Sequence, residues 1–382
     1  MSAAQDIMAG PTRIAGHKDK TVMKDGRPVN LSDIIIGVVA PGAKTFADLF
    51  GGTNTVASRA ARAGMSVITN DWRRQSCYCA RAMLENREVE PSDADAERLV
   101  SGELVLGPVT RLYGEPLGRG NAMEFDRIIR NARDLRAEGR EELAVAAFYA
   151  ITHVILAELS DYHLHLSADK SRFLGNEHLA KAPLVDAWRR WLTCEYPRCL
   201  YGPGAPSVEC HARDAVELAG EISADCMYID TLYPGGGYDH LLDFRMLEDL
   251  CDIFEGVEEE RIGKSRPLPK HRFGSRQAYV GSMTHLLMRT ASCPQLIISI
   301  NTSCDVRPEE LVLMCRAVGR TCDIHRYAVP QPAAATRLYH NPNHECLLNC
   351  RRDAGLVAEV ARIRAELARL SQGFKVEAPK KI

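Results

Sequence analysis

Short apolar runs alternate with helix-like segments in two stretches of this chain, and that alternation limits the fold more than any other feature. Residues 45–50 (TFADLF) lead through a glycine-rich turn into an Ala-rich helical segment at 56–63. A second apolar run at 65–69 (MSVIT) precedes another helical segment at 73–86. Two consecutive units of this length predict parallel strands with helical crossovers in a buried α/β sheet.

The alternation stops after residue 87 and resumes at residue 207. The intervening residues 88–206 read as helices with long loops, the clearest helical segments being 124–137, 141–159 and 184–193. Beyond the gap, strands are expected at 207–210, 225–230 and 295–301, and an antiparallel closing pair at 321–329 and 345–350. We therefore expect a mostly parallel seven-stranded sheet with an antiparallel closing strand, built from residues 31–87 and 207–352 and interrupted by a helical insertion at 88–206.

Residues 353–382 are expected to form a C-terminal helix and tail. The helix carries an apolar stripe, which consists of Leu356, Val360, Ile363, Leu367 and Leu370. A stripe of this kind predicts docking against the chain's own domain.

Charge and hydropathy exclude several classes of protein. Lys and Arg number 48 against 50 Asp and Glu, so the formal net charge is −2 and no global field draws the chain to a polyanion. No apolar run is long enough to span a membrane, and residues 1–24 lack the apolar centre of a signal peptide. We expect a cytoplasmic protein without membrane contact.

The 13 cysteines are expected to be reduced and mostly buried, because an odd number in an intracellular-looking chain does not favour a disulfide framework. Their tightest groups are Cys77 with Cys79, then Cys194, Cys199 and Cys210 beside His211, then His344, Cys346 and Cys350. None of these groups has the paired CxxC spacing of a strong zinc motif, so no metal site is predicted.

Two of the expected strand ends carry residues suited to a nucleoside. Ligands of open α/β sheets bind beyond the carboxyl ends of the strands. Residues 48–54 (DLFGGTN) place glycines before a helix, and Asp71 follows about twenty residues later, where nucleotide-binding folds place the carboxylate for the ribose hydroxyls. The glycine loop alone fits a ligand-free tight turn equally well. The chain has neither a GxxxxGK[ST] nor a GxGxxG motif, which argues against a P-loop enzyme and weakens a dinucleotide site.

A third strand end, from Asp230 to Tyr233 (DTLY), could hold a planar amine. The Asp230 carboxylate and a backbone carbonyl would accept the amine hydrogens, and the Tyr233 ring would stack on the face of the amine. The alternative is a strand-ending aspartate that caps a turn beside a buried tyrosine.

These motifs resemble a known family. Residues 44–86 are similar to the S-adenosylmethionine-binding half of the D12-class adenine-specific DNA methyltransferases, whose loop reads D-x-F-x-G-[ST]-G and whose second strand ends in N-D. Residues 207–238 resemble the stretch that holds the family's D-P-P-Y motif, and the likeness covers most of residues 32–350. It implies a Rossmann-like class I methyltransferase fold that transfers a methyl group from S-adenosylmethionine to N6 of adenine in double-stranded DNA, after the base has been flipped out.

Carried over by position, the resemblance implies a role for each motif residue. The cofactor-binding residues would be Asp48, Phe50, Gly51, Gly52, Thr53, Asn54, Asp71, Trp72 and Asp214. The catalytic residues would be Asp230, Thr231, Leu232 and Tyr233. The chain departs from the family in that Thr231 and Leu232 replace both prolines of the catalytic motif and Asn54 replaces the third loop glycine. Without the prolines, φ is no longer fixed at the carbonyl that would accept the amine hydrogen.

A basic segment after the catalytic motif would contact DNA phosphates, and the resemblance also leaves room for a restriction endonuclease partner. The residues are Arg261, Lys264, Arg266, Lys270, Arg272 and Arg276. A solvated basic loop is the alternative. Two other functions stay open for the whole chain: a catalytically impaired relative that acts as a DNA-binding or regulatory module, and methyl transfer to another planar amine, in RNA or a small molecule.

Overall fold

A computed structural model gives the fold of the chain. It describes residues 13–14, 17–18, 20–86, 89–160, 181, 183–199, 206–231, 245–262, 272–302, 304–329 and 344–373. Within these ranges the chain is an α/β protein built on a mixed sheet of nine strands, with a separate two-stranded antiparallel ribbon formed by β1 (Arg13–Ile14) and β2 (His17–Lys18).

The large sheet has the strand order β4-β3-β10-β11-β9-β8-β5-β6-β7. Its strands are β3 (Thr21–Lys24), β4 (Arg27–Asn30), β5 (Thr45–Asp48), β6 (Ser66–Asn70), β7 (Val208–His211), β8 (Cys226–Ile229), β9 (Gln295–Asn301), β10 (Arg320–Ala328) and β11 (His344–Arg352). Strands β5 to β9 are mutually parallel, whereas β11 runs antiparallel to both β9 and β10. The antiparallel closing pair predicted from the sequence is therefore confirmed.

The predicted number of seven strands is wrong, because an N-terminal hairpin extends the sheet. Strands β3 and β4 pair with each other, and Met23 of β3 pairs with Ala328 of β10. The hairpin turns at Asp25 and Gly26, which both have positive φ (49° and 75°), as a tight two-residue turn requires. An Asp-Gly pair is a strong hairpin signal, but the strands it joins are only four residues long and each carries a charged residue. The sequence pattern therefore did not reveal them.

Helices connect the strands and cover the sheet. They are α2 (Leu31–Gly37), α3 (Thr55–Arg62), α4 (Arg74–Ala80), α5 (Asp93–Leu99), α6 (Pro108–Tyr113), α7 (Arg119–Ala137), α8 (Glu141–Ser160), α10 (Leu184–Arg190), α11 (Ala215–Leu218), α13 (Arg245–Glu255), α14 (Arg276–Arg289), α15 (Pro308–Arg316) and α16 (Ala354–Gly373). Helices α4 and α10 each continue into a π-helical turn, Arg81–Glu85 and Trp191–Glu195, and short 3₁₀ turns occupy Tyr196–Cys199 and Glu259–Arg261.

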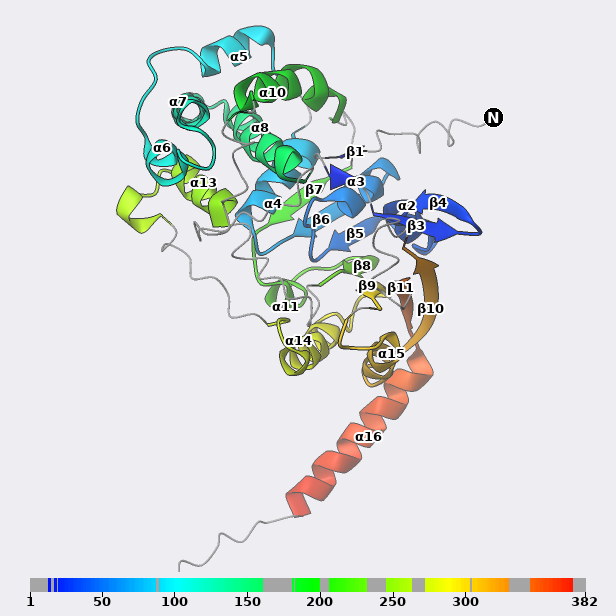
Figure 1. The fold of residues 1–382 in the computed structure, drawn as a ribbon. Helices are drawn as coiled ribbons and strands as arrows, with labels where there is room; N and C mark the ends of the chain where they lie inside the picture. The colour runs from blue at the N-terminus through cyan, green and yellow to red at the C-terminus, as the bar shows by residue number, and fades with distance from the viewer. Residues whose placement is uncertain are drawn as a thin grey trace, which may run out of the picture.

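Two hydrophobic clusters form the core, one on each face of the sheet. All seven residues of β9 are buried, which marks it as a central strand. Ile297 packs in one cluster and its neighbours Leu296 and Ile298 in the other, because successive side chains of a strand point to opposite faces. Helices α3 and α4 lie on one side of the sheet, together with α8 and the other helices of residues 88–206. Helices α11, α14 and α15 lie on the other side (Figure 1). Helix α13, which follows β8 in the sequence, joins the first group by packing on α4, α6 and α7.

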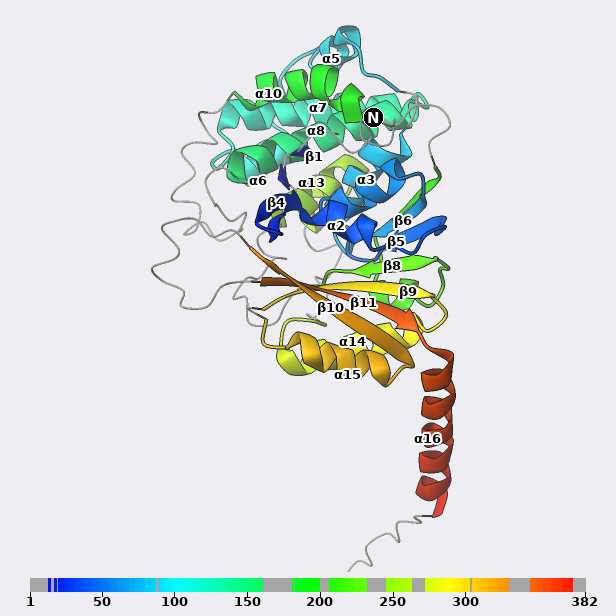
Figure 2. The same ribbon diagram turned by 90° about the vertical axis from the view of Figure 1, so that its right-hand side faces the viewer.

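The C-terminal helix does not follow its predicted packing. Helix α16 projects away from the rest of the chain (Figure 2), and the Ile363 side chain of the expected docking stripe is 44% exposed. Leu356 and Val360 of the stripe are partly buried, so the predicted docking on the chain's own domain is wrong at Ile363. In the described part of the chain, no helix combines the length and the apolar character needed to cross a membrane.

Candidate functional site

The strand order reverses beside β5, and this reversal locates the candidate site. From β5 the chain proceeds outward through β6 and β7 on one side, and later through β8 and β9 on the other. In open α/β sheets, ligands bind at such a point, beyond the carboxyl ends of the strands. The acidic residues at these ends are Asp48, the last residue of β5, Asp71 after β6 and Asp230 after β8.

The glycine loop after β5 is a tight turn held by backbone hydrogen bonds, one of them to the end of β6. The Gly51 amide donates to the Asn70 carbonyl (2.7 Å), and the Asn54 amide donates to the Gly51 carbonyl (2.6 Å). Asn54 precedes α3 and adopts the left-handed conformation (φ 59°). Asparagine tolerates this conformation better than other non-glycine residues do. Asn54 can therefore stand where the family has its third glycine without opening the turn.

The Asn54 side chain also ties the loop to its surroundings. Its amide nitrogen donates to the Ser76 carbonyl (2.9 Å), and its Oδ1 accepts from the Thr69 hydroxyl (2.6 Å). Thr53, next to it, has its hydroxyl 3.0 Å from that of Thr55. The loop is thus held by side-chain contacts to β6 and α4 as well as by its own backbone.

Replacing Gly51 with Ala is expected to destabilise the fold by about 1–3 kcal/mol. An added Cβ would lie 2.5 Å from Thr69 Oγ1 and 2.7 Å from Asn54 Oδ1, and both side chains are 2% exposed, so neither can move aside easily. Chemical denaturation monitored by circular dichroism measures the effect. The control is Gly281→Ala in α14, where the added Cβ meets nothing within 4 Å. Equal stability of Gly51→Ala and wild type would contradict the close packing of the loop.

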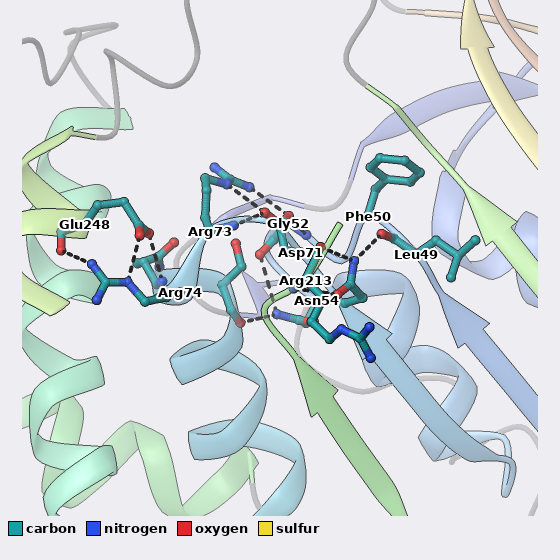
Figure 3. Close-up of polar contacts among 12 residues, drawn as sticks. Leu49, Phe50, Gly52, Asn54, Asp71, Arg73, Arg74, Arg213 and Glu248 are labelled. Atoms are coloured by element: carbon teal, nitrogen blue, oxygen red, sulfur yellow. Dashed lines mark hydrogen bonds and ion pairs between the residues drawn. The ribbon is translucent and has the colours of Figure 1, made fainter. Parts of the chain in front are cut away.

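Asp71 lies between the glycine loop and Arg73. Its carboxylate accepts from the backbone amides of Gly52 (2.9 Å) and Arg73 (2.8 Å), and it forms an ion pair with the Arg73 guanidinium (Nε to Oδ1, 3.2 Å). Figure 3 shows the carboxylate directed at both partners. Trp72, between the two charged residues, is half-buried. A ribose that used this carboxylate would therefore have to share it with Arg73.

Asp48 is a buried acid at this edge, with 2% of its surface exposed. Burial raises the pKa of its carboxyl to about 8, the hydrogen bond from the Phe50 amide opposes that rise, and the negative charges of Asp230 and Asp71 add to it. The Asp48 carboxyl therefore interacts electrostatically with the acids that follow the two neighbouring strands, β6 and β8.

The catalytic motif predicted from the sequence is described only in its first half. Asp230 directly follows β8, and its Oδ2 accepts a hydrogen bond from the Tyr228 hydroxyl (3.2 Å). Thr231 is 4% exposed. Leu232 and Tyr233 lie outside the described residues. The structure thus brings Asp230 to the edge that carries Asp48 and Asp71, and it does not test the aromatic half of the motif.

Phe50 gives the site an apolar side. Its partly buried ring meets the ring of Phe273 edge-on at 5.6 Å between centroids. In Figure 3, the ring points away from the pair formed by Asp71 and Arg73. Asp214, the last predicted cofactor residue, caps α11 by accepting from the amides of Val216 and Glu217. The edge therefore offers an apolar surface beside a charged one.

No protein-family model matches the chain, and no curated protein matches it. The chemistry of the strand ends therefore decides which ligand they fit. Carboxyl groups beside an aromatic ring suit a ligand that combines a positive charge with a planar group.

Sequence reasoning gave no separate role to Asn70, which joins two loops at this edge. Its buried side-chain amide donates to the carbonyls of Leu49 (3.1 Å) and Arg213 (3.2 Å), and its Oδ1 accepts from the Arg213 amide (3.0 Å). It thereby holds the loop after β5 against the loop after β7. The only sign of this role in the sequence is that Asn70 is a polar residue at the end of an apolar strand.

A second buried carboxylate, Glu345, was also missed. It is fully buried at the start of β11 and accepts from Ser299, Asn301 and Lys20, with the Asn301 amide at 3.3 Å. Because β11 is antiparallel to β9, its start lies at the carboxyl end of β9. Sequence reasoning treated residues 345–350 only as a strand, since the pairing that buries Glu345 is not visible in a local pattern.

Three of the six basic residues predicted to contact DNA are described, and two of these form ion pairs. Arg272 pairs with Asp214 (3.0 Å) and Arg276 with Glu310 (2.5 Å), whereas Arg261 is exposed after α13. The remaining three, Lys264, Arg266 and Lys270, lie outside the described residues. Contact of this segment with phosphate stays a prediction.

Arg74, next to Arg73, holds α4 against α13. Its guanidinium pairs with Glu248 (3.2 Å), Asp252 (2.7 Å) and Glu255 (2.9 Å), all on α13, and Figure 3 shows it directed toward Glu248. The contact therefore links α4, which follows β6, to α13, which follows β8.

Replacing Arg74 with Met is expected to destabilise the fold by about 3–5 kcal/mol, because Asp252, which is 2% exposed, would lose its buried ion pair with Arg74. The free energy of unfolding in urea measures this effect. Arg213→Met is the matched control, since Arg213 pairs with the exposed Glu221 on the surface and should contribute at most about 1 kcal/mol. Similar losses in the two variants would argue against this account of Arg74.

Proposed function

We propose that this chain transfers a methyl group from S-adenosylmethionine to N6 of adenine in double-stranded DNA. The observation that carries the proposal is the convergence of Asp48, Asp71 and Asp230 from three strand ends beside the switch in strand order. A sulfonium ion is a compact positive charge, and carboxylates in a poorly solvated place favour it. When bound, S-adenosylmethionine supplies an electrophilic methyl group.

The order of the parallel strands supports a Rossmann-like class I methyltransferase fold. Taking β5 to β9 as the first to fifth strands, their order is 3-2-1-4-5, the order of doubly wound nucleotide-binding sheets. The antiparallel pair of β10 and β11 follows beyond β9, in keeping with the closing pair expected from the sequence pattern. In this proposal, Gly51 and Gly52 lie under the methionine part of the cofactor and Asp71 holds the ribose, displacing part of its contact with Arg73.

Asp230 would accept a hydrogen bond from the target amine. The lone pair of an exocyclic adenine amine is delocalised into the ring, so acceptors that draw on its hydrogens favour the geometry needed for attack on the methyl group. Asp230 supplies one acceptor and the Thr231 carbonyl the other, with Tyr233 stacking on the flipped base. The helices of residues 88–206 would contact DNA on either side of the target.

A labelled-methyl assay tests the proposal. The full chain is incubated with duplex DNA and S-adenosylmethionine tritiated in the methyl group, and the nucleosides are then separated. We expect label in N6-methyladenine. Parallel incubations with single-stranded RNA and with a mixture of small planar amines test the other acceptors. Calorimetric binding of S-adenosylmethionine without label in any acceptor would favour a non-catalytic DNA-binding module instead.

A further inference from the structure

Three cysteine sulfur atoms meet on the opposite side of the sheet from the insertion. They belong to Cys315 of α15, Cys322 of β10 and Cys350 of β11, and all lie within 4.8 Å of one another. Cys322 and Cys350 are direct partners in the antiparallel register, and the sulfur atoms of Cys350 and Cys315 are 3.7 Å apart. Sequence reasoning had grouped Cys350 with His344 and Cys346, so this trio arises only from strand pairing and helix packing.

A buried arginine lies beside the trio. Arg320 is 1% exposed, and its Nη2 donates to the carbonyls of Thr290 (2.6 Å) and Cys293 (2.8 Å). Among the described residues, its Nε and Nη1 have no hydrogen-bond partner, and no carboxylate pairs with it. The guanidinium interacts electrostatically with the Cys293 thiol and with all three thiols of the trio. A buried cation without a counter-charge is unfavourable, and this points to negative charge at the trio in the functional state.

We propose that Cys315, Cys322 and Cys350 bind one zinc ion as three thiolates. Binding converts three thiols and one Zn²⁺ into a tris-thiolate complex of charge −1 and releases three protons, and the adjacent guanidinium then makes the site neutral. Zn–S bonds of about 2.3 Å place tetrahedral sulfur ligands about 3.8 Å apart, close to the 3.7 Å between Cys315 and Cys350. Three protein ligands leave the fourth position to solvent, and Cys322 is the member of the trio that retains exposure.

A disulfide accounts for the trio less well. It would consume two of the three thiols, leave the third unused and give Arg320 no counter-charge. Packing of three neutral thiols as small apolar side chains also leaves the guanidinium uncompensated. A divalent ion that prefers sulfur is the ligand that removes this imbalance, since a monovalent ion would leave the site with a net negative charge.

The test uses the full chain, reduced, stripped of metal with a chelator and kept free of oxygen. Titration with Zn²⁺ against a chromophoric chelator should show one tight equivalent per chain. Cys315→Ser, Cys322→Ser and Cys350→Ser should each weaken that equivalent by at least about 100-fold. Cys293→Ser is the matched control, because Cys293 is buried in the same cluster beside Arg320 but is not part of the trio. It should bind zinc as wild type does.

A second measurement does not depend on variants that fold. Co²⁺ added to the wild-type chain should give thiolate charge-transfer bands with an intensity that corresponds to three sulfur ligands. Zn²⁺ should protect Cys322 from alkylation while the exposed Cys194 stays reactive. Three results would each overturn the proposal. They are no zinc binding by the folded, reduced wild type, unchanged zinc affinity in Cys322→Ser, and a thiol titration of the native chain that finds two thiols fewer than its cysteines, as a disulfide would give.

Discussion

Replacing Asp230 with Asn is expected to slow methyl transfer to DNA at least about 100-fold. The amide preserves the shape of the side chain, but it loses the negative charge and turns one acceptor into a donor. The target nitrogen becomes positively charged as the methyl group is transferred, so the effect should fall on the chemical step. Single-turnover kinetics with saturating DNA and labelled S-adenosylmethionine measure that step directly.

Two controls separate this effect from a general loss of folding or affinity. Glu221→Gln makes the same chemical change at an exposed carboxylate that pairs with Arg213, and it should leave the rate unchanged. Calorimetric affinity of Asp230→Asn for S-adenosylmethionine should fall by less than about tenfold, because Asp48 and Asp71 remain. A variant that transfers methyl groups at the wild-type rate would exclude Asp230 as the acceptor for the amine.

Local pattern predicts the central parallel strands β5, β8 and β9 well, because those strands are buried on both faces. Strand β9 is apolar at most of its positions and was expected at its observed bounds. The hairpin of β3 and β4 lacks that signal, since it lies at the sheet edge and carries charged residues. Pro28 in β4 is tolerated there because an edge strand has unpaired backbone donors. The N-terminal hairpin is therefore the part of this sheet that hydrophobic pattern leaves out.

The candidate site shows a similar division. The spacing of Asp48, Asp71 and Asp230 after apolar runs could be read from the sequence, since parallel strands bring their carboxyl ends to one edge. The partners of these residues could not. The pairing of Arg73 with Asp71, the three acids around Arg74 and the meeting of Cys315 with Cys322 and Cys350 depend on packing between distant segments.

Asp48 should make the fold less stable as the pH rises, and Asp48→Asn should remove that dependence. The carboxyl has a pKa of about 8 in the folded chain against 3.8 for an unperturbed group. The folded state thus holds the proton more tightly than the unfolded state does. The stabilisation is fully present below about pH 4 and is lost as the pH rises through about 8, at about 1.4 kcal/mol per pH unit.

Urea unfolding of both chains at pH 5, 7 and 9 isolates this contribution, because the other titrating groups are common to the two. The Asn variant keeps an acceptor for the Phe50 amide and has no proton to lose, so its stability relative to wild type should rise by at least about 2 kcal/mol between pH 5 and pH 9. A difference that stays constant with pH would show that Asp48 is not protonated in the folded chain.

The same group should couple the binding of S-adenosylmethionine to proton release. Asp48 is largely protonated at pH 7, and a cation bound beside it favours the ionised carboxylate, so binding should expel part of a proton from the wild-type chain. Titration calorimetry in two buffers of different ionisation enthalpy measures the release. Asp48→Asn should bind with no such release. Equal release from both chains would place the responsible group elsewhere, and none from either would mean that the bound positive charge lies away from Asp48.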